Sequence, residues 1–177
     1  EPNRLLVISA MGIDATSIDD WTAENSPLAK RLANHVKSMA SLGLAPQLVL
    51  WQQGEADAKL GTSEEAYGAG LDRLAKILSR AQSSAPIVMA RSTVCRSAPN
   101  AQVRGAIASK ATSNARFQLG PDTDSLTGPR FRIDGCHFSV EGLDATSRMW
   151  AETIARLTGM SLRTRYSSHI ANHGAQI

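Results

Sequence analysis

The chain has 177 residues, of which 42% are hydrophobic and 20% are charged, the composition of one globular domain rather than of a disordered or fibrous protein. Its 19 Lys and Arg against 16 Asp and Glu give a net charge of +3, too small a surplus to indicate nucleic acid or a membrane surface as a partner. The longest nearly apolar run, residues 5–13, is about half of the ~20 residues that a membrane-spanning helix needs, so we expect no membrane span.

The first half of the chain alternates predicted strands and helices. Residues 4–9 are apolar and rich in β-formers, which predicts a buried strand followed by a polar loop. Ser26 and Pro27 provide the N-cap and first position of a helix that Gly43 ends. Residues 47–51 predict the next strand.

The second half continues this alternation. Ser63, followed by two glutamates, opens a helix with an apolar inner face. The remaining predicted elements are a strand at 86–90, a helix at 99–114, a short strand at 117–119, and a helix from Ser139 to near Gly159 with Trp150 in the core.

Strands separated by helices of ten or more residues favour right-handed βαβ crossovers. We therefore predict an α/β fold with a small, mainly parallel sheet covered on both faces. Residues 1–160 form the expected single domain, and residues 161–177 form a polar C-terminal tail.

Reactive groups of such sheets collect in the loops after the strands. The first such loop, residues 12–21, is rich in small and hydroxyl residues and could present backbone N–H groups to an oxyanion. An ordinary polar loop is the alternative.

The second loop, Trp51 to Asp57, has two adjacent amides, a glycine and two carboxylates. The amide of a glutamine can donate a hydrogen bond to a negatively charged oxygen without adding a charge of its own. A hydrogen-bonded turn with a capping Glu55 is the alternative.

The third loop places Asp134 three residues before His137, across Gly135 and ahead of a helix cap. A carboxylate at this spacing can hold one ring nitrogen and leave the other free to act as a base. A surface aspartate beside a capping histidine is the alternative.

Other kinds of site have less support. Asp134, Cys136 and His137 could ligate zinc, but the chain has no second cluster at metal spacing. His169 and His173 stand four residues apart in the polar tail, and residues 68–70 do not make a full phosphate-binding loop. Cys95 and Cys136 could form one disulfide, which leaves the redox compartment open.

Three blocks, taken in order, resemble the sialate O-acetylesterase-like branch of the SGNH/GDSL hydrolases. Residues 51–57, Trp-Gln-Gln-Gly-Glu-Ala-Asp, resemble its Trp-x-Gln-Gly-Glu-x-Asp block, and residues 134–139 with the helix after them resemble its Asp-x-x-His block. Ala15 to Ile18 and Trp21 resemble the end of its Gly-Gly-Thr-Ser block, with Asp14-Ala15 in place of Gly-Gly.

The resemblance implies a three-layer α/β/α fold and removal of small acyl groups, chiefly acetyl, from carbohydrate, with no cofactor or metal. By motif position His137 is the base that activates a serine, and Asp134 orients it. The Gln53 side chain and a backbone N–H near Ala15 supply the oxyanion hole, and Glu55 braces the loop.

The nucleophile of that family lies in a Gly-x-Ser block upstream of all three blocks, and nothing in this chain matches it. Ser9 follows an apolar run and is a less favoured candidate. Because the sequence begins Glu1-Pro2-Asn3 and enters a predicted strand at once, we expect a preceding segment to carry the serine and a central strand. Residues 1–177 alone are then inactive, or fold only together with that segment. Because polysaccharide esterases of this family often work outside the cytoplasm, the resemblance implies a periplasmic or secreted location.

Two other classes of function are alternatives to an esterase. A catalytically inactive carbohydrate-binding or scaffold domain would explain the missing nucleophile, but not the joint presence of Gln53, Asp134 and His137. A flavodoxin-like nucleotide-binding domain would share the sheet, but it needs a phosphate loop that the sequence lacks.

Overall fold

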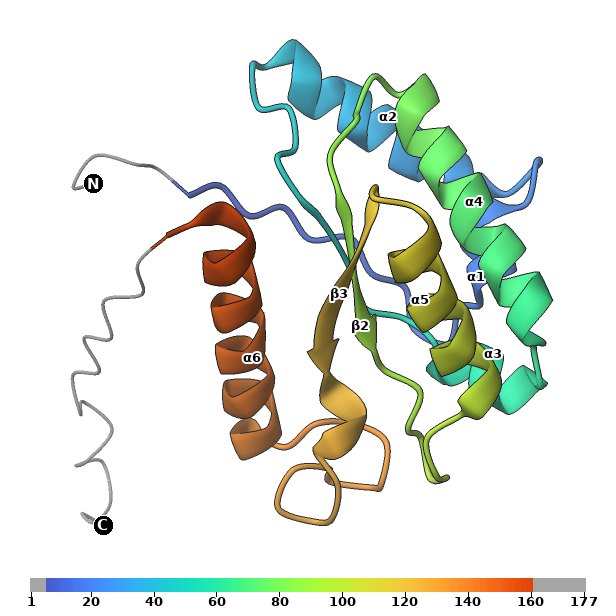
Figure 1. Cartoon of the computed structure of the whole chain (residues 1–177), viewed down its shortest axis with the longest axis vertical. Helices are drawn as coiled ribbons and strands as arrows, with labels where there is room; N and C mark the ends of the chain where they lie inside the picture. Colours follow the sequence, from blue (N-terminus) through green and yellow to red (C-terminus); the bar gives the residue numbers. More distant parts are fainter. Residues whose placement is uncertain (1–5, 161–177) are drawn as a thin grey trace, which may run out of the picture.

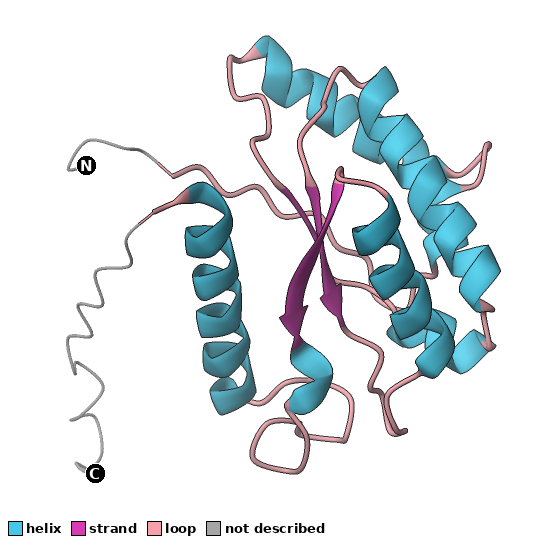
Figure 2. Ribbon diagram, in the orientation of Figure 1, coloured by secondary structure: helices cyan, strands magenta, loops and turns pink. Residues whose placement is uncertain are grey.

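The computed structural model describes residues 6–160. They form three layers, with a parallel sheet in the middle and helices on both of its faces (Figures 1 and 2). The described strands are β1 (Val49–Trp51), β2 (Ile87–Arg91) and β3 (Phe117–Asp122), in the order β1-β2-β3. Val49 pairs with Ile87, and Ile87 pairs with Phe117, so the three strands start in register and end at one edge. This confirms the predicted α/β class with a mainly parallel sheet.

The helices begin and end where local signals stand in the sequence. They are α1 (Ile18–Thr22), α2 (Pro27–Ser41), α3 (Glu55–Leu60), α4 (Glu64–Arg80), α5 (Ala101–Ser113) and α6 (Val140–Thr158), with a 3-10 turn η1 (Thr123–Ser125) after β3. The side chains of Ser26, Ser63 and Ser139 cap α2, α4 and α6, as predicted.

The main core lies between the sheet and helices α1, α2, α4 and α5. Apolar residues of all three strands pack there against the inner faces of those helices; the fully buried ones include Tyr67, Leu71, Leu74, Ile107 and Phe117. Helix α6 covers the other face of the sheet, beside β3 (Figure 1). Trp150 of α6, predicted to be core, is only half-buried, and its indole N–H donates to Gln52 Oε1 at 2.6 Å.

The prediction of a buried strand at 4–9 is wrong for the part that the structure describes. Residues 6–9 have no regular structure, and Leu6, Val7 and Ile8 are exposed. A strand forms only by hydrogen bonding to a neighbour, and no described strand pairs with this segment. The β-propensity of these residues was therefore not enough to predict a strand.

Two short helices interrupt predicted loops. Helix α1 is capped by Ser17, whose side chain and backbone N–H exchange hydrogen bonds with Asp20. Helix α3 begins after Gly54, where an added Cβ would lie 2.6 Å from the carbonyl oxygen of Ser92. Glycine thus lets the loop after β1 approach the loop after β2.

Within residues 6–160, no helix is long and apolar enough to cross a membrane. The predicted tail, 161–177, with His169 and His173, lies outside the described residues.

Candidate active site

The three strands place the segments that follow them at the same edge of the sheet. Gln53 follows β1, Ser92 follows β2 and Asp124 follows β3, and the strands run parallel. The loop of Asp134 and His137 contacts the segment after β2, as its bonds to Cys95 and Arg96 establish. Polar groups from distant parts of the chain therefore meet at the carboxyl edge.

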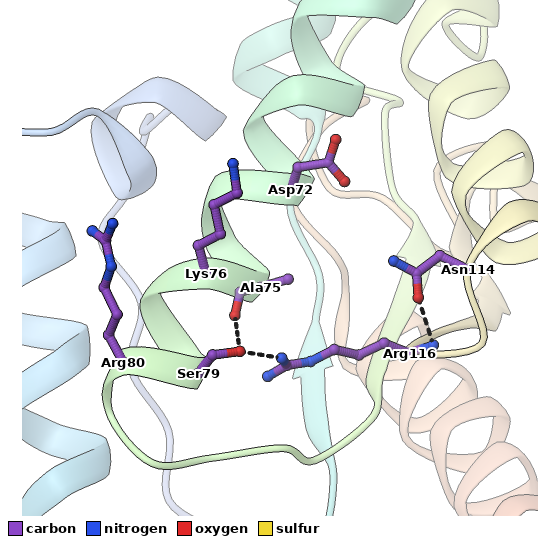
Figure 3. A pocket seen from close by; sticks show the side chains of 7 residues that line it. All are labelled: Asp72, Ala75, Lys76, Ser79, Arg80, Asn114 and Arg116. Carbon is purple, nitrogen blue, oxygen red and sulfur yellow. Dashed lines mark hydrogen bonds between the residues drawn. The ribbon is translucent and has the colours of Figure 1, made fainter.

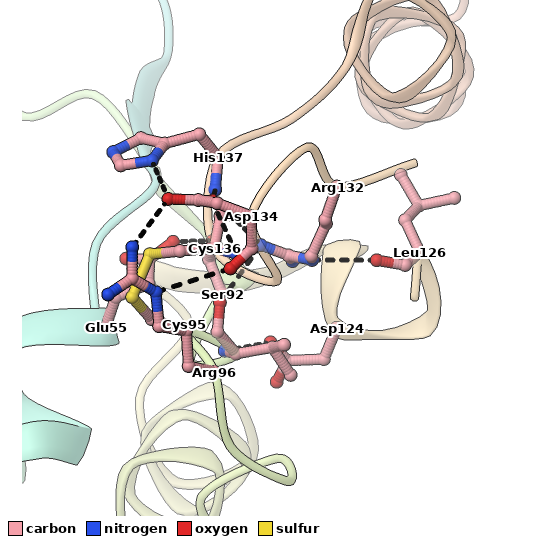
Figure 4. Close-up of a disulfide and its surroundings, with 11 residues drawn as sticks. Glu55, Ser92, Cys95, Arg96, Asp124, Leu126, Arg132, Asp134, Cys136 and His137 are labelled. Carbon is pink, nitrogen blue, oxygen red and sulfur yellow. Dashed lines mark hydrogen bonds and ion pairs between the residues drawn. A yellow bond between two sulfur atoms is a disulfide. The ribbon is translucent and has the colours of Figure 1, made fainter. Parts of the chain in front are cut away.

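Asp134 and His137 form a hydrogen-bonded pair (Figure 4). Asp134 Oδ2 lies 3.0 Å from His137 Nδ1, and Asp134 Oδ1 accepts the backbone N–H of His137 at 2.8 Å. Gly135, with φ +78°, makes the turn that brings the carboxylate back to the ring. The ring projects outward from the loop, and the His137 side chain is 68% exposed.

Several donors keep Asp134 ionised. The backbone N–H of His137, the Arg96 guanidinium and the His137 ring hold the pKa of Asp134 well below its usual range. The carboxylate is thus an acceptor at neutral pH, which favours a proton on His137 Nδ1 and leaves Nε2 able to accept one. This is the arrangement of an oriented general base.

The loop is tied to the segment after β2 by a disulfide and a backbone bond. Cys136, next to His137, is bonded to Cys95. The backbone N–H of Arg96 donates to the carbonyl oxygen of Gly135 at 2.8 Å. The disulfide removes the Cys136 thiolate that the zinc alternative requires, and the described residues contain no cluster suited to a metal ion.

Gln53 lies in a buried hydrogen-bond network. Its Nε2 donates to Asp57 Oδ2 at 2.5 Å and to the carbonyl oxygen of Thr16 at 3.0 Å, and its Oε1 accepts from the Tyr67 hydroxyl at 3.0 Å. Both N–H bonds of the amide are therefore occupied in this structure. Donation to an oxyanion requires one of these two bonds to open.

The first predicted loop meets the second through this network. Asp57 Oδ2 also accepts the backbone N–H of Ile18, the first residue of α1. Ala15 lies in the turn just before Thr16, is exposed, and has φ +57°. The sequence blocks of Ala15 and Gln53 are thus neighbours in space, and the role of the Ala15 backbone stays a prediction.

Glu55 connects the loop after β1 to the segment after β2. Its Oε1 accepts from Ser92 Oγ at 2.6 Å. Burial raises the pKa of Glu55, while the Ser92 hydroxyl and the nearby Arg132 charge oppose that shift. The carboxyl group faces the protein rather than solvent, and its bracing role stays a prediction.

Three buried polar residues of this edge received no role from the sequence. Asp57 is 1% exposed and bonds to Ile18, Gln53 and Thr62. Its position in the second sequence block is the one feature from which a role could have been predicted. Asp124, 2% exposed, accepts the backbone N–H groups of Thr93 and Val94. Arg132 is 2% exposed and has no local signal beyond its place before Asp134.

Ser9, the less favoured nucleophile, contacts a different histidine. Its Oγ lies 2.8 Å from His35 Nε2, on an exposed surface. The described contacts of Ser9 therefore do not join it to His137.

A surface hollow of about 530 Å³ lies at the opposite edge of the sheet (Figure 3). It is lined by residues of α4 and of the turn before β3: Asp72, Ala75, Lys76, Ser79, Arg80, Asn114 and Arg116. Arg116 donates there to Ser79 Oγ and to the carbonyl oxygen of Ser83. The hollow is separate from the Asp134–His137 pair.

Comparison with known proteins identifies the family. The family model of carbohydrate esterases described as sialic acid-specific acetylesterases matches residues 3–156. No curated protein and no solved structure matches the chain. The matched range contains all three sequence blocks, the described sheet and most of α6. The chain therefore belongs to the sialic acid-specific acetylesterase family of carbohydrate esterases, which is of the SGNH hydrolase type.

Proposed function

We propose that this chain supplies the base and orienting acid of a serine esterase that removes small acyl groups, chiefly acetyl, from carbohydrate. The observation that carries the proposal is the hydrogen bond between Asp134 and His137 at the carboxyl edge of the sheet, with the ring exposed. The family match supports ester hydrolysis on a carbohydrate.

The proposed reaction has two half-reactions. In the first, His137 Nε2 takes the proton of a serine hydroxyl, and the serine oxygen attacks the acyl carbonyl. The tetrahedral intermediate then collapses, and the sugar oxygen leaves with the proton from His137. In the second, water attacks the acyl-serine with the same assistance and releases the carboxylic acid and the serine.

The serine of this proposal comes from a segment outside residues 1–177. Support for that segment lies at β1, which pairs only with β2 among the described strands. Leu50 of β1 is 41% exposed, and the apolar residues 6–8 are exposed. One added parallel strand on β1 would satisfy the unpaired strand edge and cover apolar surface.

Two donors are proposed to stabilise the tetrahedral oxyanion. One is the Gln53 side chain, and the other is a backbone N–H in the turn at Ala15, the block that Gln53 touches through Thr16. For Gln53 this role requires its N–H bond to Thr16 or to Asp57 to open when the substrate binds.

The second candidate function is an inactive carbohydrate-binding or scaffold domain of the same fold. One observation favours it: both N–H bonds of the Gln53 amide are taken by Asp57 and Thr16, so this side chain has no free N–H for a substrate oxygen.

Acetyl release separates these two candidates. The protein is produced with the residues that precede Glu1 in its reading frame and assayed on O-acetylated sialic acid and acetylated xylan. We expect acetate release that His137→Ala abolishes and His35→Ala retains; the control, His35, contacts Ser9 but not Asp134.

Serine labelling tests where the nucleophile lies. A fluorophosphonate probe should label the longer protein and leave residues 1–177 unlabelled. Labelling of residues 1–177 that is lost in Ser9→Ala and His35→Ala would assign the nucleophile to Ser9 and contradict the proposal. Absence of acetate release from the longer protein on both substrates would favour the inactive domain.

A further inference from the structure

A buried arginine lies at the base of the loop that carries Asp134 and His137 (Figure 4). Arg132 is 2% exposed, although arginine is almost never fully buried without a partner. Removing a guanidinium ion from water is unfavourable unless its N–H groups find hydrogen-bond acceptors in the protein. The hydrogen-bond partners of Arg132 therefore indicate which parts of the chain it holds together.

The guanidinium donates to four backbone carbonyl oxygens. Its Nε donates to Leu126 at 2.8 Å, and its Nη2 donates to Thr123 at 3.1 Å. Its Nη1 donates to Val94 at 3.0 Å and to Cys136 at 2.5 Å. One planar group thus joins the segment after β2, the turn after β3 and the residue next to His137.

Among the residues that the structure describes, no carboxylate forms a direct ion pair with Arg132, and its charge is balanced at a distance. Burial lowers the pKa of Arg132, and the negative charges of Glu55 and Asp124 act in the opposite direction. The Phe138 ring lies over the guanidinium, 4.4 Å from its carbon to the ring centroid. The N–H groups are therefore left for the carbonyl oxygens.

The backbone closes the loop above this side chain. Arg132 and Phe138 form an isolated antiparallel bridge, and the N–H of Ile133 donates to the carbonyl oxygen of His137 at 2.9 Å. Asp134 and His137 lie between these two ends. Movement of the Arg132 side chain would therefore be transmitted to both members of the pair.

We infer that Arg132 is a positioning residue, whose contacts with the four carbonyl oxygens fix the 132–138 loop so that His137 is held against Asp134 at the carboxyl edge of the sheet. The inference rests on the proposed function for its catalytic meaning. Lysine is a poor replacement, because a single ammonium group cannot reproduce the planar array of donors.

The first test reads the loop directly in the longer protein and needs no activity. Imidazole ¹⁵N spectra report which His137 nitrogen carries the proton, and amide exchange reports the Cys136 and His137 N–H groups that Asp134 accepts. Arg132→Lys should weaken the preference for a proton on Nδ1 and speed exchange of both amides about tenfold or more.

A control separates positioning from general loss of stability. Leu74→Ala removes a fully buried side chain on the far side of the sheet from α6 and should lower the melting temperature without changing the His137 signals. Phe138→Leu, which removes only the ring over the guanidinium, is the milder second variant and should shift the same signals less. Unchanged His137 signals in both Arg132→Lys and Phe138→Leu would overturn the inference.

The activity arm uses the longer protein that contains the nucleophile. Arg132→Lys should lower kcat about 10²-fold with little change in KM, the effect of misplacing a catalytic group by about 1 Å. If the longer protein releases no acetate but the His137 signals change as expected, the proposed function fails and the positioning role stands. A fall in kcat with unchanged His137 signals would count against the positioning role.

Discussion

The sulfur of Cys136, the residue before His137, is bonded to that of Cys95 in the segment after β2. The pairing spans 41 positions of sequence and ties the Asp134–His137 loop to the end of the central described strand. It lies beside the backbone bond from Arg96 to Gly135, so one covalent link and one hydrogen bond hold the same turn.

Loss of this disulfide should destabilise the protein. The double variant Cys95→Ser/Cys136→Ser should lose about 2–4 kcal/mol of unfolding free energy, because the open chain gains entropy when it unfolds. Urea unfolding followed by circular dichroism measures the change. Reductant should reproduce it in the native sequence and have no effect on the double variant. Equal unfolding midpoints with and without the disulfide would contradict this prediction.

Asp57 should be a stability residue. Asp57→Ala removes the acceptor of the Ile18 N–H and of a Gln53 N–H, and each buried donor left unpaired costs about 1–3 kcal/mol. We therefore expect a loss of at least about 2 kcal/mol in urea unfolding. Asp72→Ala is the matched control, because its carboxylate forms a half-exposed ion pair with Lys110 and should contribute about 1 kcal/mol or less. Equal losses in the two variants would argue against the buried network.

Glu55 should make stability depend on pH. Burial raises the pKa of Glu55 in the folded protein above the ordinary value of 4.5, so the folded state binds a proton more tightly than the unfolded state. The contribution of Glu55 to the free energy of unfolding is fully present below pH 4.5, and it is lost as the pH rises through the raised pKa of the folded state. Glu55→Gln keeps an acceptor for the Ser92 hydroxyl and cannot ionise.

Relative to the native sequence, Glu55→Gln should therefore gain unfolding free energy as the pH rises from 4 to 7. Denaturant unfolding at a series of pH values measures the difference between the two proteins. Glu24→Gln, at an exposed loop position, provides the comparison for a change of net charge alone. A difference for Glu55→Gln that stays constant or falls with pH would show that its carboxyl group is not disfavoured as an anion.

Gln53→Ala should lower turnover in the longer protein that carries the nucleophile. Loss of one oxyanion donor reduces kcat about 10²–10³-fold with a small effect on KM. Initial rates over a range of substrate concentrations separate the two constants. Gln52→Ala is the control, because that amide bonds to the Trp150 indole instead. A change confined to KM would exclude an oxyanion role for Gln53.

The sequence by itself predicted the features that depend on neighbouring residues. Ser26, Ser63 and Ser139 cap helices because a serine side chain reaches N–H groups two or three positions ahead. The Asp134–His137 hydrogen bond is equally local, since Gly135 turns the chain between the two side chains. Apolar periodicity likewise predicted the three described strands and the order of the long helices.

Only the tertiary structure decided what depends on distant partners. Residues 6–9 have strand composition but no strand, because a β-strand needs a neighbour to pair with. The contacts of the Gln53 amide with Thr16 and Asp57, and those of the Arg132 guanidinium with carbonyl oxygens of four other residues, could not be predicted from the sequence. Such contacts depend on the tertiary structure because a buried polar group must be hydrogen-bonded, and its partner is often far away in the sequence. Local sequence patterns do not show which distant residues become neighbours.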